Sequence, residues 1–186
     1  MTITRISSYV VASLFILHAN VAGITNQADQ ATSHGLEFEG IKHNYKLTFP
    51  KNWTLFTPLD AGKLPPHLLN NFIRLKLSAI AVSPDNISNI SLAVTSDEFN
   101  VSEMTVPDDP RVQKIRTGIQ TIKGREWFIE EVLFGRTINE KFSPMTRSYT
   151  TATKYKNGTI RLTFTFLFWA EDHREIVDNV LTSYVE

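Results

Sequence analysis

The sequence predicts an α+β fold, in which a mostly antiparallel sheet carries an amphipathic helix at the C-terminal end of the chain. Three observations lead to this prediction. From Glu37 onward most segments alternate apolar and polar residues, which is typical of half-buried strands. The pair Asn157-Gly158 separates two such segments and favours a tight hairpin. After Trp169 the apolar residues recur at helical spacing, and a helix packed on an antiparallel sheet is a stable layer arrangement.

The first half of the domain predicts two pairs of strands. The first pair is bounded by Pro50 and Pro58, and a polar turn beginning at Ser83 separates the members of the second pair. The predicted strands are residues 45–49, 53–56, 75–82 and 90–94.

Two long connections interrupt these strands. Residues 59–71 are expected to form a loop, in which a short helix can begin near Pro65-Pro66 because proline suits the first helical turn. Residues 96–110 are expected to form a second loop. The next segment, 112–134, predicts a long hairpin that turns at Lys123-Gly124. Its apolar residues fall on both faces, which indicates central strands covered on both sides.

The hairpin of residues 146–168 has the clearest pattern. A two-residue turn at Asn157-Gly158 sets a register with one apolar face, continued by Phe168, and one polar face. The predicted partners are Tyr155 with Ile160, Thr153 with Leu162, Thr151 with Phe164, and Tyr149 with Phe166.

The final helix is predicted from one apolar stripe, formed by Ile176, Val177, Val180, Leu181 and Tyr184. Asp172 and Glu175 have the spacing of a capping box, which indicates a helix that starts beside them.

The N-terminal residues 1–23 have the layout of a secretory signal peptide. Arg5 precedes an apolar run, and small residues lead to a cleavage site expected after Gly23. A membrane anchor needs about 20 apolar residues, which is more than this run contains; a buried N-terminal helix is the other alternative. The prediction is a signal peptide over 1–23, a flexible linker over 24–35 and a single domain over 36–186.

Charge and cysteine content exclude several classes. The chain has 19 basic and 19 acidic residues and no cysteine. Without a basic excess, a nucleic-acid partner is not expected, although a local patch remains compatible with this balance. A missing cysteine excludes a bacterial lipoprotein, whose lipid is attached to a cysteine, and it excludes disulfides. No stable membrane anchor is expected after signal removal.

No catalytic or cofactor motif is present, and the prediction is a non-enzymatic protein without cofactor or metal. Serine occurs in neither Gly-x-Ser-x-Gly nor Ser-x-x-Lys. The histidines lack the i, i+4 spacing of a zinc-binding helix. The two acidic pairs lack the alternating ligands and glycine of a calcium loop, so Asp108-Asp109 is expected to form a solvated turn and Glu130-Glu131 to alternate across a strand. Structural capping by Asp172 is favoured over an Asp172-His173 catalytic pair. The four histidines downstream of the signal are His34, His43, His67 and His173.

The tryptophans and asparagines leave two further alternatives. The tryptophans are expected to pack in the core, with a sugar or hydrophobic-ligand groove as the alternative. Glycosylation would apply only in a eukaryotic secretory pathway. The tryptophans are Trp53, Trp127 and Trp169, and the acceptor asparagines are Asn52, Asn86, Asn89, Asn100 and Asn157.

The arrangement of aromatic, proline and glycine positions resembles a known superfamily. The positions are Tyr-x-Leu-x-Phe-Pro-x-x-Trp from Tyr45 to Trp53, the turn at Lys123-Gly124-Arg125, the Asn157-Gly158 hairpin and the final Ser183-Tyr184. Together they resemble the PsbP/Mog1/DcrB-like superfamily, with its bacterial domains of unknown function, over roughly residues 36–186.

This resemblance implies a central antiparallel sheet with flanking helices, and action by binding proteins such as photosystem subunits, a small GTPase or toxin transmembrane segments. It carries over no catalytic residues. The chain lacks the lipidation cysteine of DcrB lipoproteins, and its signal sets it apart from the cytosolic GTPase and toxin binders.

The expected function is therefore that of an exported, non-enzymatic domain, periplasmic or secreted, that binds another envelope or exported protein. Loops 59–71 and 96–110 are the expected contact surfaces, because scaffolds place recognition on such connections. An immunity or inhibitor protein against an exported toxin is one alternative, and a carrier of a small apolar ligand is another.

Overall fold

The computed structural model describes residues 35–40, 44–156 and 158–186. The predicted signal peptide with its cleavage site at Gly23 lies outside the described residues, as do nearly all of the predicted linker, His34, His43 and Asn157. None of the helices among the described residues has the length and apolar character needed to cross a membrane.

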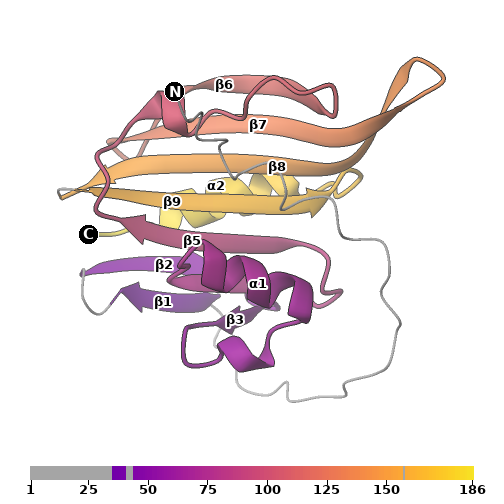
Figure 1. Cartoon of the computed structure of the whole chain (residues 1–186). Helices are drawn as coiled ribbons and strands as arrows, with labels where there is room; N and C mark the ends of the chain where they lie inside the picture. Colours follow the sequence, from indigo (N-terminus) through magenta and orange to yellow (C-terminus); the bar gives the residue numbers. More distant parts are fainter. Residues whose placement is uncertain (1–34, 41–43, 157) are drawn as a thin grey trace, which may run out of the picture.

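Seven antiparallel strands form the central sheet (Figure 1), in the order β3-β4-β5-β9-β8-β7-β6. A separate two-stranded sheet joins β1 and β2. The first sheet contains β3 (Thr54–Phe56), β4 (Ala79–Val82), β5 (Asn89–Thr95), β6 (Val112–Ile122), β7 (Arg125–Ile138), β8 (Lys141–Tyr155) and β9 (Gly158–Leu167), and the second contains β1 (Leu36–Gly40) and β2 (Tyr45–Phe49).

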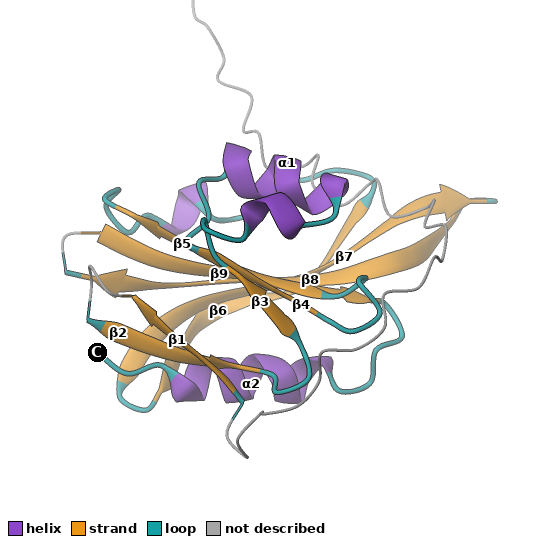
Figure 2. Cartoon of the chain, turned by 90° about the horizontal axis from the view of Figure 1, so that it is seen from below, coloured by secondary structure: helices purple, strands orange, loops and turns teal. Residues whose placement is uncertain are grey.

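The helices lie on opposite faces of the sheet, as Figure 2 shows. Helix α1 (Pro66–Arg74) covers one face, whereas α2 (His173–Ser183) and the β1–β2 pair cover the other. Two short 3-10 turns, η2 (Ala61–Lys63) and η3 (Val101–Glu103), lie in the long connections. This confirms the predicted α+β fold with a C-terminal helix on an antiparallel sheet.

The α2 face carries the main core. Side chains from β2, the sheet and α2 meet there, and Lys46 and Val185 exchange backbone hydrogen bonds of 2.8 and 3.1 Å that fix the chain end to β2. The largest fully buried side chains in this core are Trp127, Tyr45, Tyr149, Phe49, Phe164 and Phe166. Trp53 and Trp127 belong to it as predicted, but Trp169 does not: it is 68% exposed.

The predicted register of the β8–β9 hairpin is wrong by two residues, although its faces are right. Tyr155 pairs with Gly158 and Tyr149 with Phe164, because β9 begins at Gly158 itself. A Cβ on Gly158 would lie 2.0 Å from the carbonyl oxygen of Thr95, so this glycine permits close approach of β5. A shift of two residues keeps every side chain on its predicted face.

Three other predictions need correction. The β6–β7 hairpin turns at Lys123-Gly124 as predicted, but β6 is an exposed edge strand and not a central one. Asp172 is the N-cap of α2, yet its side chain makes no capping hydrogen bond, so the capping box is absent. In the predicted strand 75–82, only Ala79–Val82 is a strand.

Candidate functional site: a groove on the α1 face

The two long connections form the walls of one groove on the α1 face of the sheet. Helix α1 packs its Leu68 and Phe72 against Ile80 and Val82, at the β4 side of the sheet. The loop containing η3 lies on the other side, with Met104 against Phe128 of β7. Between them the faces of β5, β9 and β8 form the floor of a cavity of about 820 Å³, which we call the sheet groove.

The floor of the sheet groove is a ladder of short polar side chains. Strand pairing places Asn89, Thr165 and Ser148 in one row across β5, β9 and β8. The next row contains Ser91, Thr163 and Thr150, and the third contains Ala93, Arg161 and Ala152. All but Ala152 line the groove. Alternation on β8 and β9 predicted this polar face correctly.

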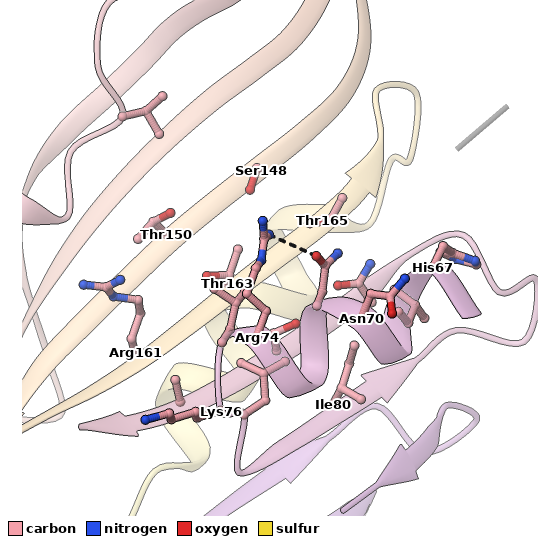
Figure 3. A pocket seen from close by; sticks show the side chains of 18 of the residues that line it. His67, Asn70, Arg74, Lys76, Ile80, Ser148, Thr150, Arg161, Thr163 and Thr165 are labelled. Carbon is pink, nitrogen blue, oxygen red and sulfur yellow. Dashed lines mark hydrogen bonds between the residues drawn. The ribbon is translucent and has the colours of Figure 1, made fainter. Parts of the chain in front are cut away.

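Basic side chains line the sheet groove from three elements. Arg74 lies in the last turn of α1, Lys76 follows that helix and Arg161 projects from β9. Figure 3 shows the Arg74 side chain extending from α1 over the floor, with its guanidinium bonded to Asn71 Oδ1 at 3.1 Å. His67, on the first turn of α1, adds an imidazole to the lining. Among the described residues that line the groove, none is Asp or Glu.

Lys76 occupies a backbone position that usually belongs to glycine. Its φ is +49°, and Leu77 N–H donates to Phe72 O at 3.1 Å while Lys76 N–H donates to Ile73 O at 3.2 Å. This is a Schellman ending, in which a left-handed residue terminates the helix. A lysine there forgoes glycine's conformational freedom but places a cation near the negative end of the α1 dipole, at the groove edge.

A buried carboxylate holds the second wall. Glu130 is fully buried on β7, and its Oε2 accepts a 2.7 Å hydrogen bond from the backbone N–H of Val106, which lines the groove. Its Oε1 has no hydrogen-bond partner in the described part of the chain. Burial raises the pKa of Glu130, an effect that the Val106 N–H and nearby Lys114 oppose. The wall is thus anchored through a group whose ionised form is disfavoured.

Glu130 is therefore expected to make the domain less stable as the pH rises. Because its pKa is raised in the folded chain, the folded chain binds this proton more readily than the unfolded chain. Its contribution to the free energy of unfolding is fully present below the ordinary carboxyl pKa, and it is lost as the pH rises through the raised pKa. Glu130→Gln cannot ionise, so its stability relative to wild type is expected to increase over that interval.

Urea unfolding at a series of pH values measures this difference, with Glu126→Gln, exposed on the same strand, as the control for loss of a charge. A Glu130→Gln variant that follows the wild type in parallel at every pH contradicts the prediction.

On the opposite face, Glu131 forms a second polar cluster that sequence patterns did not reveal. Arg147 Nη1 donates to Glu131 Oε1, and Arg116 Nε lies 3.2 Å from Oε2. Nearby, Tyr149 Oη and His173 Nδ1 are 3.0 Å apart. Burial, followed by the Glu131 charge, raises the pKa of Tyr149; burial, followed by Arg147, lowers the pKa of His173. Both shifts favour the uncharged forms of tyrosine and imidazole. Because Tyr149 lies on β8 and His173 on α2, their contact attaches α2 to the sheet.

The structure also places the remaining candidate residues. His173 is in contact with Tyr149 rather than a lone surface histidine, whereas His67 is exposed. Asp108 and Asp109 are bonded to Lys114 and Arg111. Glu130 and Glu131 alternate as predicted, but both are buried. In the described ranges, no group of three or more His, Asp or Glu side chains is placed to hold a metal ion. Of the acceptor asparagines, Asn86 and Asn89 line the groove.

Comparison with solved structures identifies the fold. PsbP from the cyanobacterium Synechocystis sp. PCC 6803 (CyanoP) superposes with a TM-score of 0.54 at 11% identity, covering 87% of this chain and 98% of that one. The chain has the PsbP fold. The predicted resemblance to PsbP-like proteins is thus confirmed for the fold, including its antiparallel sheet and flanking helices.

Two further structures are similar to this chain. A Bacteroides thetaiotaomicron protein has a TM-score of 0.51 at 12% identity over 82% of this chain, which spans only 48% of that protein. LpqN of Mycobacterium tuberculosis, which is involved in cell envelope biogenesis, has a TM-score of 0.41 at 13% identity, with 75% and 79% of the two chains covered. No family model matches the sequence, and no curated protein matches it. At 11% identity the similarity to CyanoP shows the fold alone, and function has to be argued from the groove.

Proposed function

We propose that this chain is an exported, non-enzymatic domain that binds another envelope or exported protein through the sheet groove. One observation carries the proposal: the two loops expected from the sequence to recognise a partner, 59–71 and 96–110, contribute to opposite walls of the same groove. Within 59–71 the lining residues, such as His67 and Asn70, lie on helix α1, and within 96–110 they are loop residues such as Thr105 and Val106. Recognition residues are commonly found on loops that a rigid scaffold positions. The signal-like leader supports export.

The chemistry of the groove also supports binding rather than catalysis. Its lining contains hydroxyls, amides and cations, but no cysteine or carboxylate among the described residues. General acid–base work needs a titratable group within reach of the substrate. His67 is the single histidine in the described lining, and it is exposed at the start of α1. The groove therefore offers contacts for recognition, without a paired acid and base.

Filling the groove tests this function. Thr163 lies in the middle row of the floor, so Thr163→Trp is expected to reduce recovery of an envelope partner at least about tenfold in a pull-down at physiological salt. Thr137→Trp, exposed on the projecting β7–β8 hairpin, is the matched control and should recover the partner like wild type. Recovery of no partner, or equal recovery by both variants, would count against the proposal.

The volume of the groove supports one alternative, the carrier of a small ligand, since about 300–1,000 Å³ is usual for ligand pockets. Its lining combines a floor of hydroxyls and a basic rim with apolar side chains such as Leu75, Ile80 and Phe134, so a ligand with both apolar and polar parts fits it. Native mass spectrometry of the protein purified from its own host distinguishes the two functions, because a carrier retains a bound small molecule.

A further inference from the structure

The sheet groove concentrates positive charge in a chain whose net charge is zero. Acidic and basic residues are equal in number, at 19 each. Nevertheless, Arg74, Lys76 and Arg161 all line the groove, and the described lining contains no carboxylate. A cleft lined by one sign of charge attracts ligands of the opposite sign and accelerates their association. The segregation therefore indicates an anionic occupant.

Two of the groove cations, Arg74 and Lys76, are available for such an occupant. Arg74 bonds to the neutral Asn71 side chain, and neither Arg74 nor Lys76 forms an ion pair with any carboxylate that the structure describes. Both side chains are exposed. A neutral amide partner leaves the charge of Arg74 uncompensated, whereas Arg111, Lys114 and Arg147 elsewhere in the fold all pair with acids.

The cations are spread along the floor and do not converge on one point. Arg161 and Thr165 lie on the same face of β9, four residues apart, which corresponds to about 13 Å along a strand. Figure 3 shows Arg74 extending over the floor on the side of Ser148 and Thr165, with Arg161 farther along the strand. A single small anion cannot contact both ends, but a chain with repeated negative charges can.

Between the cations, the floor offers hydroxyl groups that have no hydrogen-bond partner among the described residues. The hydroxyls of Thr150, Thr163 and Thr165 are half-buried on the groove side, and within the described chain none of them bonds to another residue. Hydroxyls both donate and accept, so they can pair with the amide and carbonyl groups of an extended backbone. The cations of the groove can bind acidic side chains of a peptide, and its hydroxyls can bind the backbone of the same peptide.

We infer that the sheet groove binds an acidic, extended segment of the partner protein, with Asp or Glu side chains on Arg74, Lys76 and Arg161 and peptide groups on the threonine ladder. This inference rests on the proposed function and specifies the partner's chemistry. Opposite charges placed in this way chiefly determine association rate and specificity, so binding should weaken as salt is added.

A defined probe tests the inference: fluorescein-labelled oligoglutamate, with oligoglutamine as the neutral probe, in anisotropy titrations against the folded protein. Oligoglutamate is expected to bind and oligoglutamine to bind at least about tenfold more weakly. The variant Arg74→Gln/Lys76→Gln/Arg161→Gln should lose at least about tenfold in affinity for oligoglutamate. The matched variant Lys51→Gln/Arg136→Gln/Lys141→Gln removes three exposed cations outside the groove lining and should bind like wild type.

Several results overturn the inference. Binding of inorganic phosphate that displaces the peptide identifies a small-anion site, and binding of phosphatidylglycerol vesicles without peptide binding identifies a membrane surface. Absence of binding by oligoglutamate, or equal loss in both triple variants, also contradicts an acidic segment in the groove. Backbone amide shifts of Thr150 and Thr163 on peptide addition provide a second readout that does not depend on the variants.

The two proposals fail in different ways. If Thr163→Trp loses the envelope partner but the variant without groove cations retains it, the groove binds a protein and the inference of an acidic segment is wrong. If neither variant affects recovery of the partner, the groove is not the binding surface and the proposed function fails with it.

Discussion

Glu131→Gln is expected to lower the free energy of unfolding by about 3 kcal/mol. Glu131 is fully buried, and the Arg147 side chain that donates to it is only 14% exposed. Losing the carboxylate leaves a guanidinium charge in the interior without its partner, which costs far more than a surface ion pair contributes. Because whole domains are stable by about 5–15 kcal/mol, this is a large fraction of the total. Equilibrium unfolding in urea at neutral pH measures the loss.

Two companion variants separate charge burial from other causes. Glu126→Gln lies on the same strand but is exposed, so it should change stability by no more than about 0.5 kcal/mol. The double variant Glu131→Leu/Arg147→Met removes the carboxylate and its more buried partner. It should be more stable than Glu131→Gln, because the charge that remains is that of Arg116, whose side chain is 46% exposed and can be solvated. If Glu131→Gln costs no more than Glu126→Gln, the ion pair does not stabilise the fold as described.

The position of this ion pair explains how α2 is held without its expected cap. Asp172 makes no side-chain cap, so the first turn of α2 depends on tertiary contacts. His173 supplies one of them through Tyr149, whose ring also lies 6.0 Å from the Arg116 guanidinium. The Glu131 cluster and the start of α2 are therefore one structural unit, and disturbing the carboxylate is expected to loosen the helix start as well.

The sequence predicted which face each hairpin residue occupies, but not its partner. Successive side chains of a strand point to opposite faces, and the alternation of apolar and polar residues shows which face is buried. Tyr149 and Phe164 were therefore correctly placed on the apolar face. Register depends on the turn, and the sequence favoured a type I′ turn with positive φ at both Asn157 and Gly158. In the structure Lys156 has the positive φ of 47°, whereas Gly158 is the first strand residue and is required by the nearby Thr95 carbonyl. That constraint comes from β5, which lies far away in sequence.

The order of the strands in the sheet could not be predicted from local sequence patterns either. Ile115 and Ile119 indicated a covered strand, yet they are 41% and 60% exposed because β6 is the edge of the sheet. Which strand ends at an edge depends on pairings such as β5 with β9, which join distant segments. Basic side chains and a bulge between Lys114 and Arg116 protect this edge, as is common for exposed strands.

The candidate site was predicted in part. Residues of 59–71 and of 96–110 line the same groove, whereas their expected contacts with a partner stay a prediction. Its cations were missed because they come together only in three dimensions: Arg74 and Lys76 follow the expected loop, and Arg161 belongs to a strand. Balanced overall charge concealed this local excess. The one local signal was Arg161 on the polar face of the hairpin, which acquires meaning only once α1 is known to lie beside it.

Phe166→Ala is expected to cost about 4 kcal/mol of unfolding free energy. Phe166 is 1% exposed on β9, at the centre of the α2-side core. Its ring lies 6.2–6.4 Å from four others, namely those of Trp53, Tyr149, Phe164 and His173. Truncation removes buried apolar surface and leaves a cavity that strands on both sides prevent from collapsing. A domain without disulfides depends on such packing, because nothing covalent replaces it.

Phe168→Ala provides the matched control, since it removes the same ring two residues further along the chain. Phe168 is 36% exposed and its described ring contact is the Arg147 guanidinium, 6.0 Å away, so its loss should cost less than about 1 kcal/mol. Thermal and urea unfolding of the two variants measure how the loss of stability depends on burial, because both replace phenylalanine by alanine. Similar losses for both would mean that the aromatic core is not the main source of stability, whereas a large difference locates that source beneath α2.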